Sequence, residues 1–506
     1  KVWEDIWRKV DVKVTGDRLA QKLLRLHIYH TLVTTSPHST GNDFGIPARG
    51  LHGEEYRGHI LWDELFIFPF FCLHYPEIAK SVLMYRYRRL SQARENAKGN
   101  GLKGAMFPWQ SGSDGREETL MDIFDPQSGE WSKDYSSLQR HVSLAIAYNV
   151  WNYFNITGDI DFMNDYGSEL FFDICRFWSS IAKLDPKTNR YSIEGVVGPD
   201  VYHQRIPGVT EAGVKDNAYT NIMVVWLFKR AFDLMEAMGE NRRKMVLRSI
   251  SLQEEELELW RNQISRMNLS ISPEGVLEQF EGFFSLKEID WNTYREKLDK
   301  TNPLHSLLKS EGKATDVFKV CKQADALMIF FNILPAEVMQ IIQDLGYTLP
   351  TDYLKNNFEY YYNRCAHSSS LAALTHAYVA ALAGMNNLSR DLYQKALKFD
   401  YNDEKGNTTA EGIHLGAMTG AVMMTLTAFA GLNYQGDLLS ISPNLPKPWR
   451  SIEFSISFKG EEYCVCVKKE QVKIKRMGTP GESSRVVING KEFVLTADRE
   501  IVVNIS

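Results

Sequence analysis

The spacing of apolar residues changes once along the chain, and this change limits the fold more than any other feature. Up to about residue 433, apolar residues recur at every third or fourth position in a series of segments, which is the spacing of one face of an α-helix. From residue 441 they alternate with polar residues in short runs, as in β-strands, and Asn489-Gly490 is a typical hairpin turn. The pattern predicts about eleven or twelve helices followed by about six strands. The helical segments include 19–35, 137–156, 168–184, 218–239, 252–267, 351–364 and 389–399.

Long polar loops separate several of these helices. The loop 195–221 is rich in Gly, Pro and Asp and carries Tyr202, His203 and Tyr219. A loop of this length between helices is usually functional or disordered. We expect it to form one wall of an active site, and a polar excursion on the surface is the alternative.

Helices that alternate with such loops indicate a mainly α fold, an α/α toroid followed by a small antiparallel β-sheet. We predict a linker helix region at 1–20, a barrel domain of catalytic type at 21–433 and a C-terminal β-sheet domain at 434–506. The loops at one end of a toroid converge on a central cleft. This convergence would bring together Trp62-Asp63, Trp109, the loop 195–221, Lys322-Gln323, the segment 367–370 and His414.

The amino-acid composition limits the kinds of molecule that the chain is expected to bind. Aromatic residues make up 12% of the chain, a share that suits sugar pockets as well as a large core. The net charge of -5 and the lack of a Lys/Arg block argue against nucleic acid, and no apolar run reaches the ~18 residues of a membrane span. Six scattered cysteines indicate reduced thiols and a cytoplasmic location. We find no metal-binding cluster or nucleotide loop in the sequence, so we expect no metal and no cofactor.

Several segments, taken in order, resemble glycoside hydrolase family 65, the maltose, trehalose and kojibiose phosphorylases and their hydrolase relatives. The resemblance rests on the stretches GHILWDELFIFPF, YRYRRLSQARENAKGNGLKGAMFPWQSG, VVGPDVYH, DNAYTN, CKQADALM, AHSSSLAALTHA and NTTAEGIHLGAMTG. It implies an (α/α)6 barrel with a C-terminal β-sheet layer. The family also has an N-terminal β-sandwich, which we expect to be missing, because the chain opens where the linker helices would lie.

The resemblance places a proton donor in the loop after Gly198, and here the sequence departs from the family. Inverting cleavage of a glycosidic bond needs a carboxylic acid to protonate the leaving oxygen. In the family this acid is a Glu directly after Gly-Pro-Asp, whereas here Asp200 is followed by Val201, which cannot donate a proton. Asp200 and Glu211 are weak substitutes, because neighbouring residues point in different directions and nothing fixes Glu211. Nothing in the sequence fixes the position of Glu194 either.

Sugar-binding positions follow from the same resemblance. Trp62-Asp63 resembles the family's sugar-holding pair, with a stacking face and a carboxylate acceptor, and Lys322-Gln323 resembles its second pair. Trp109 lies in a matching loop beside the pocket. Without the resemblance, a core tryptophan beside a helix-capping Asp and a lysine at a helix start would explain these residues.

The segment 367–370 resembles the phosphate-binding loop of the phosphorylases. His367, Ser369 and Ser370 would offer polar groups at a helix N-terminus, a ready anion site, and His414 would add an imidazole. A plain serine cap is the alternative. A hydrolase would need a carboxylate base instead, for which Glu411 or the pair 403–404 are candidates.

The predicted function is inverting phosphorolysis of an α-linked glucose disaccharide to β-glucose 1-phosphate and glucose, with inorganic phosphate as co-substrate. Hydrolysis of the same substrates is the first alternative. A catalytically disabled carbohydrate-binding relative, explained by Val201, is the second. The expected partners are a small sugar and phosphate, without nucleic acid or membrane, and a homodimer is possible.

Overall fold

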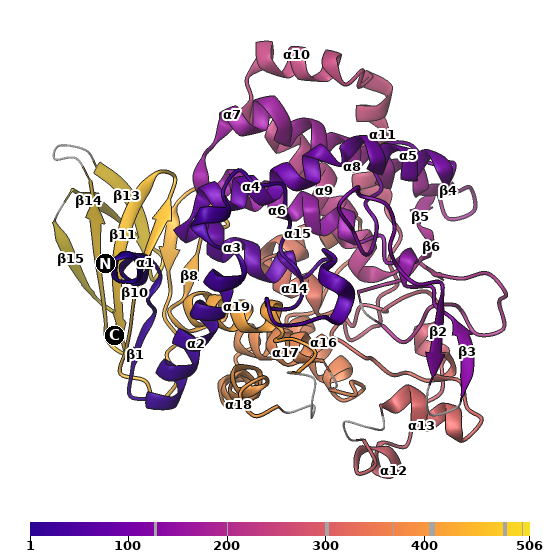
Figure 1. Cartoon of the computed structure of the whole chain (residues 1–506). Helices are drawn as coiled ribbons and strands as arrows, with labels where there is room; N and C mark the ends of the chain where they lie inside the picture. Colours follow the sequence, from indigo (N-terminus) through magenta and orange to yellow (C-terminus); the bar gives the residue numbers. More distant parts are fainter. Residues whose placement is uncertain are drawn as a thin grey trace.

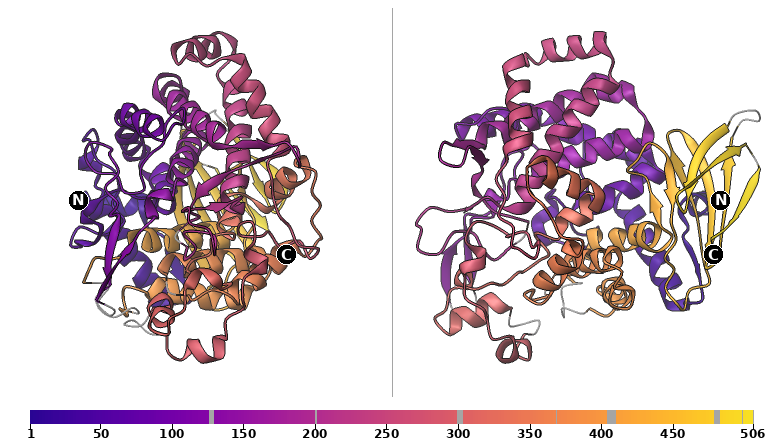
Figure 2. Two further views of the ribbon diagram at one scale, coloured as in Figure 1. Left: turned by 90° about the vertical axis from the view of Figure 1, so that its right-hand side faces the viewer. Right: turned by 180° about the vertical axis from the view of Figure 1, so that it is seen from behind.

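The computed structural model describes residues 1–125, 129–199, 201–298, 303–367, 369–403, 410–478, 483–497 and 499–505. Two parts lie side by side, a large helical body and a smaller β-sheet part that carries both chain ends (Figure 1). Seen from the side and from behind, the β-sheet part stays on one flank of the helical body (Figure 2). The order of helices first and strands last agrees with the change in apolar spacing.

The helical body is a closed ring of helices within a second layer. In the inner ring each helix contacts the next, and the last returns to the first. The predicted toroid is therefore confirmed. The inner helices are α3 (Glu64–His74), α6 (Val142–Thr157), α9 (Ala218–Ala237), α14 (Met328–Asn332), α17 (Ser370–Leu382) and α19 (Leu415–Met424). The outer helices include α2 (Arg18–Thr34), α4 (Pro76–Arg88), α8 (Ser168–Ile181), α11 (Glu254–Arg266), α16 (Tyr353–Tyr362) and α18 (Asn386–Lys398).

Composition decides which helices are inner. Every residue of α3 and of α19 is buried, and a helix that is apolar all round is stable only inside a core. The outer helix α18 instead buries one face and leaves the other in solvent. Proline predicts breaks near Pro69 and Pro76. The break at Pro76 is confirmed, because α4 begins there, but the one at Pro69 is wrong, since α3 continues through this residue.

Other differences from the predicted pattern lie in the second half of the helical body. The apolar run 326–334 forms only the five residues of α14, and α10 (Glu240–Ser249) is an additional polar helix that stands away from the body (Figure 2). The sequence of 280–311 shows no helical spacing and predicts an irregular, exposed segment, but Ile289, Tyr294, Leu304 and Leu308 pack into a small core of their own. The remaining helices are α1 (Val2–Val10), α5 (Leu90–Gly99), α7 (Ile160–Phe162), α12 (Trp291–Arg295), α13 (Leu304–Ser310) and α15 (Pro335–Asp344).

The C-terminal part consists of two sheets, one with the order β1-β10-β11-β12-β15 and one with the order β14-β13-β9-β8. The predicted antiparallel region is confirmed, with one parallel pairing between β9 and β13. Asn489 and Gly490 both have positive φ, as the hairpin between β13 and β14 requires. The strands are β1 (Lys13–Thr15), β8 (Leu432–Asn433), β9 (Leu439–Ile441), β10 (Ser451–Phe458), β11 (Glu461–Lys468), β12 (Gln471–Met477), β13 (Ser483–Ile488), β14 (Lys491–Thr496) and β15 (Glu500–Asn504).

The N-terminal segment reaches into this part. Strand β1 pairs with β10, so residues from the predicted linker region complete the larger sheet. Short hairpins decorate the helical body: β2 (Asp122–Asp125) with β3 (Glu130–Lys133), β4 (Lys183–Asp185) with β5 (Arg190–Ser192), and β6 (Glu194–Val196) with β7 (Val214–Lys215). Within the described ranges, no helix is both long enough and apolar enough to cross a bilayer.

Candidate functional site

A cavity of about 270 Å³ lies where inner helices begin. It gathers residues that directly precede α3, α17 and α19, together with side chains from three loops. Most of the residues predicted to bind sugar or phosphate line it, although they are far apart in the sequence. The lining consists of Ala48, Arg49, Glu55, Tyr56, Leu61, Trp62, Asp63, Trp109, Lys322, Gln323, Ser369, Ser370, Leu371, Phe399, Glu411, His414 and Ala417.

Two tryptophans form the aromatic side of the cavity. The buried ring of His141 lies between them, with its centroid 5.0 Å from that of Trp62 and 5.4 Å from that of Trp109. Burial lowers the pKa of His141 to about 3, so the ring is neutral and acts as an uncharged spacer at neutral pH. This packing holds both indoles in the cavity lining, and an indole ring suits the apolar face of a pyranose.

Lys322 and Gln323 connect the sugar side to the serine side. Gln323 Nε2 donates a hydrogen bond to Ser369 Oγ over 3.1 Å. The preceding residue, Cys321, forms an isolated β-bridge with Cys365, just before the serine segment. The two predicted binding segments are therefore held against each other by backbone and side-chain contacts.

Asp400 fixes His414 at the opposite wall. Its carboxylate accepts hydrogen bonds from His414 Nδ1 at 2.8 Å and from the His414 backbone N–H at 2.9 Å. Burial would raise the pKa of Asp400, but the bonds and charge of His414 outweigh it and lower the pKa. The bond from Nδ1 to Asp400 fixes the orientation of the imidazole, so Nε2 is the ring nitrogen that remains for a ligand in the cavity.

This wall has the properties of an anion site. Ser369 and His414 are the residues at which α17 and α19 begin, and helix N-termini attract anions through free N–H groups and the helix dipole. Arg49 also lines the cavity, donates to the Gly412 carbonyl over 3.1 Å and pairs with Glu55. The sequence analysis missed Arg49 and Asp400, because a single Arg or Asp in a loop carries no pattern.

The loop that carries Val201 lies next to this cavity but not in its wall. The backbone N–H of Val197 donates to the Leu138 carbonyl over 2.9 Å, and Val201 is buried with 8% exposure. None of the described residues of 195–221 lines the cavity, so the expected wall is not found there. Asp200 lies outside the described residues, as do Ser368 and Glu404.

Of the carboxylates considered as substitutes for a proton donor, the two that the structure describes, Glu211 and Glu194, do not line the cavity. Glu211 is exposed and accepts a hydrogen bond from Thr210 over 3.0 Å. Glu194 is also exposed, in β6, and neither it nor Asp403 belongs to the lining. The carboxylates that do line it are Glu55, Asp63 and Glu411.

A buried acid that sequence reasoning missed lies directly against the loop. Asp325 Oδ2 accepts a hydrogen bond from Asn217 Nδ2 over 2.9 Å. A Cβ on Gly198 would lie only 2.4 Å from the same oxygen, so only glycine allows this approach. Burial raises the pKa of Asp325 to about 8, so the carboxyl is largely protonated at neutral pH. Its role is to hold the loop, since it does not line the cavity.

His367 stands apart from the other predicted phosphate residues. It does not line the cavity, and its ring packs on Tyr362 with a centroid distance of 4.6 Å. Its backbone has a positive φ of 53°, so the chain turns sharply here and directs the ring behind the serine segment.

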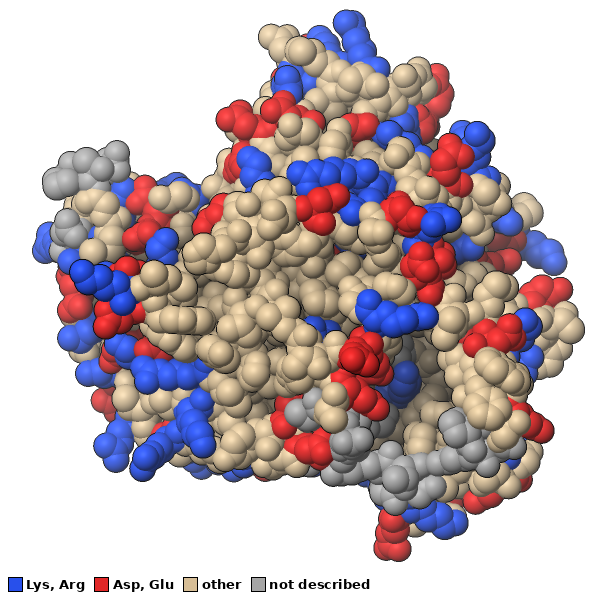
Figure 3. Space-filling view, in the orientation of Figure 1, with Lys and Arg blue, Asp and Glu red and all other residues tan. Residues whose placement is uncertain are grey.

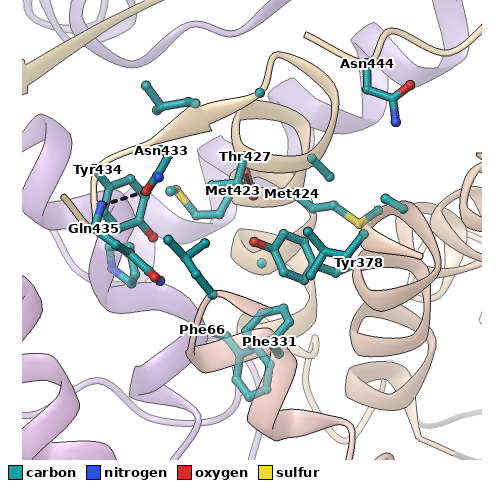
Figure 4. A pocket seen from close by; sticks show the side chains of 18 of the residues that line it. Phe66, Phe331, Tyr378, Met423, Met424, Thr427, Asn433, Tyr434, Gln435 and Asn444 are labelled. Carbon is teal, nitrogen blue, oxygen red and sulfur yellow. Dashed lines mark hydrogen bonds between the residues drawn. The ribbon is translucent and has the colours of Figure 1, made fainter. Parts of the chain in front are cut away.

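A second cavity, of about 370 Å³, is lined by the first turns of α3 and by the C-terminal parts of α17 and α19. Phe66, Phe331 and Tyr378 line one side and Met423 and Met424 another, while Asn433 and Gln435 come from the connection to the β-sheets (Figure 4). Leu65 lines it, whereas Asp63 lines the first cavity, so the start of α3 separates the two.

The surface shows no broad region of a single charge on the face turned toward the viewer. Lys, Arg, Asp and Glu side chains are interspersed around a hollow at the lower right, and a wide uncharged area lies at the centre left (Figure 3). Among the described residues of this face, we see no extended basic track of the kind that follows a nucleic acid backbone.

Comparison with known proteins gives concordant results along the chain. The glycosyl hydrolase family 65 central catalytic domain matches residues 25–423, and the family 65 C-terminal domain matches residues 432–495. A solved structure described as a putative kojibiose phosphorylase from human microbiome superposes with a TM-score of 0.82 at 25% identity, covering 100% of this chain and 68% of its own.

Curated relatives are longer than this chain. An uncharacterized glycosyl hydrolase of Mycobacterium tuberculosis is 39% identical over 91% of this chain and 34% of its own length. The trehalose 6-phosphate phosphorylase of Lactococcus lactis is 36% identical, over 93% and 60%. The kojibiose phosphorylase of Caldanaerobacter subterraneus is 33% identical, over 97% and 61%. The chain thus spans between about a third and three fifths of the length of these relatives.

Proposed function

Because the chain belongs to glycosyl hydrolase family 65, we propose that its cavity binds an α-linked glucoside together with phosphate. Phosphate attacks the anomeric carbon with inversion and yields β-glucose 1-phosphate. One observation carries this proposal: a single cavity gathers two tryptophans and a carboxylate together with the serines and the histidine at two helix N-termini. The relatives named as phosphorylases agree with this assignment.

The proposed reaction is a displacement across the cavity. A phosphate oxygen held by Ser369, Ser370 and His414 forms a bond to the anomeric carbon while the glycosidic C–O bond breaks on the other face. Asp63, Lys322 and Gln323 hold the hydroxyls of the glucosyl ring, and the tryptophans contact its apolar edge. Binding both reactants in one orientation supplies the main acceleration.

Val201 determines which leaving groups this site expels. A sugar alkoxide is a poor leaving group and needs a proton, and general acid catalysis contributes about 10²–10⁴-fold. Fluoride leaves as an anion without a proton. The proposed site therefore acts on α-glucosyl fluoride without help from position 201 and acts slowly on disaccharides.

The test uses α-glucosyl fluoride with and without phosphate. We expect fluoride release to depend on phosphate and to be matched by β-glucose 1-phosphate. The Ser370→Ala variant should need roughly 10–100-fold more phosphate, as expected for the loss of a hydrogen bond to a charged group. Fluoride release without phosphate would instead establish hydrolysis, and no release at saturating substrate would contradict both reactions.

Two other functions each have one observation in their favour. Hydrolysis is favoured by Glu411, a carboxylate in the cavity lining on the side of His414, where a base would activate water. A disabled sugar-binding role is favoured by Val201 and its buried position. The fluoride assay separates all three functions.

A further inference from the structure

A cysteine and two histidines lie together behind the serine segment. Cys365 and His367 directly precede α17, and His376 lies inside that helix. One ligand atom from each residue lies within 4.8 Å of the others. None of the three lines the cavity that we assign to sugar and phosphate, so the proposed function leaves them unexplained.

His376 is held in the form that binds metals. Its side chain is fully buried, and Nδ1 donates a hydrogen bond to the Ala372 carbonyl over 2.7 Å. The proton therefore lies on Nδ1, and Nε2 keeps its lone pair. Nε2 is buried and has no hydrogen-bond partner in the part of the chain that the structure describes. Metal-binding histidines commonly donate their other N–H to a carbonyl in this way, and a buried polar atom without a partner needs an explanation.

Cys365 and His367 each bring a ligand atom close to His376. Cys365 is buried, and its Sγ accepts a hydrogen bond from the His367 backbone N–H over 3.3 Å. The rings of His367 and His376 have centroids 5.4 Å apart. The positive φ of His367 is unusual for a residue other than glycine, and such strain is often found at functional sites.

We propose that Cys365, His367 and His376 form a binding site for Zn²⁺, with a fourth position for water. One thiolate and two imidazoles are a preferred donor set for this ion. Bonds of about 2.0–2.3 Å in a tetrahedron place ligand atoms about 3.3–3.8 Å apart, so the cluster must contract by up to about 1.5 Å. His367, which is more exposed than the other two, supplies this movement.

Charge balance agrees with the inclusion of the cysteine. Arg295 and Lys395 act electrostatically on His367 and disfavour a cation there. On binding, the Cys365 thiol loses its proton to solvent and the thiolate forms the S–Zn bond, which cancels one of the two positive charges.

Cobalt titration of the full chain tests the site, because Co²⁺ replaces Zn²⁺ and is coloured. We expect one Co²⁺ per chain, with a thiolate-to-cobalt charge-transfer band and the visible bands of a tetrahedral ion, all removed by Zn²⁺. Cys365→Ser should remove the charge-transfer band, and His376→Gln should weaken binding by roughly 100-fold, at the upper end of the loss that outer-shell changes cause.

Cys321→Ser is the matched control, because this buried thiol is the bridge partner of Cys365 but bonds to Gln279 Oε1. It should leave the bands unchanged. If the variants of the buried Cys365 or His376 fail to fold, His367→Gln replaces them, and this variant should also weaken Co²⁺ binding. No charge-transfer band in the original chain, or a band that survives Cys365→Ser and disappears in Cys321→Ser, would overturn the proposal. No sugar or phosphate is present, so the outcome is independent of the proposed reaction.

Discussion

At the scale of single residues, buried carboxyl groups organise the site from outside its lining. Asp400 holds His414 by two hydrogen bonds, and Asp325 supports the loop of Val201 through Asn217 and the approach of Gly198. Neither aspartate was predicted from the sequence, because their partners are distant in the chain or belong to an irregular loop. The lining residues were found because they occur within longer motifs.

Replacing Asp400 tests the anion side. The Asp400→Asn variant keeps the shape but loses the carboxylate that accepts hydrogen bonds from the ring and the backbone of His414, so we expect phosphate to bind about tenfold more weakly, a change of about 1.4 kcal/mol. Isothermal titration calorimetry with phosphate measures this. Because the folded state lowers the pKa of Asp400, its stabilising effect is present above the ordinary Asp pKa and is lost as the pH falls through the lowered value. An unchanged affinity for phosphate would contradict the role given to Asp400.

Asp325 has the opposite pH dependence. Its pKa rises from 3.8 to about 8 in the folded state, so between these values the folded chain holds a proton that the unfolded chain has lost. The Asp325 contribution to the free energy of unfolding is therefore largest below about pH 4 and decreases until about pH 8. Asp325→Asn should remove this decrease, and melting temperatures from pH 5 to pH 8 measure it. An equally steep decrease in the variant would show that Asp325 is ionised in the folded protein.

At the scale of elements, the sequence predicted the helices that apolar spacing determines and the hairpin that its turn residues determine. The inner helices α3, α17 and α19 follow from continuous apolar runs, and the β13–β14 hairpin follows from Asn489-Gly490. Strand β1 was missed because three residues are too short to show alternation. The shortness of α14 was missed because Lys322-Gln323-Ala324-Asp325 is held by tertiary contacts rather than by helix formation.

The loop after β6 is the element whose position matters most for the reaction. Gly198→Ala would push a methyl group into Asp325 Oδ2 and Asn217 Nδ2, which lie 2.4 and 2.7 Å from the Cβ position. We expect a loss of about 1–3 kcal/mol in the free energy of unfolding, the usual effect of overpacking. Gly99→Ala is the control, because nothing lies within 4 Å of its Cβ position. Equal denaturation midpoints for the two variants would show that the loop shifts without cost.

At the scale of the whole molecule, the ring of inner helices explains why distant motifs meet. Trp62-Asp63, Ser369-Ser370 and His414 directly precede or begin α3, α17 and α19, and these helices run in the same direction around the ring. Their N-terminal ends therefore form the first cavity, while the C-terminal parts of α17 and α19 line the second. The convergence was predicted from the alternation of helices and loops, but the exclusion of the Val201 loop from the lining required the three-dimensional structure.

The central claim is that the cavity is built for phosphorolysis and that the loop beside it carries no proton donor at position 201. The most direct measurement compares the original chain with Val201→Glu on a panel of α-glucose disaccharides with phosphate, and quantifies β-glucose 1-phosphate. Val201→Gln is the control, with the same shape and no acid. We expect Val201→Glu alone to raise turnover by about 10²–10⁴-fold, the usual contribution of a general acid. Equal and negligible turnover in all three proteins, or rapid turnover by the original chain, would contradict the claim.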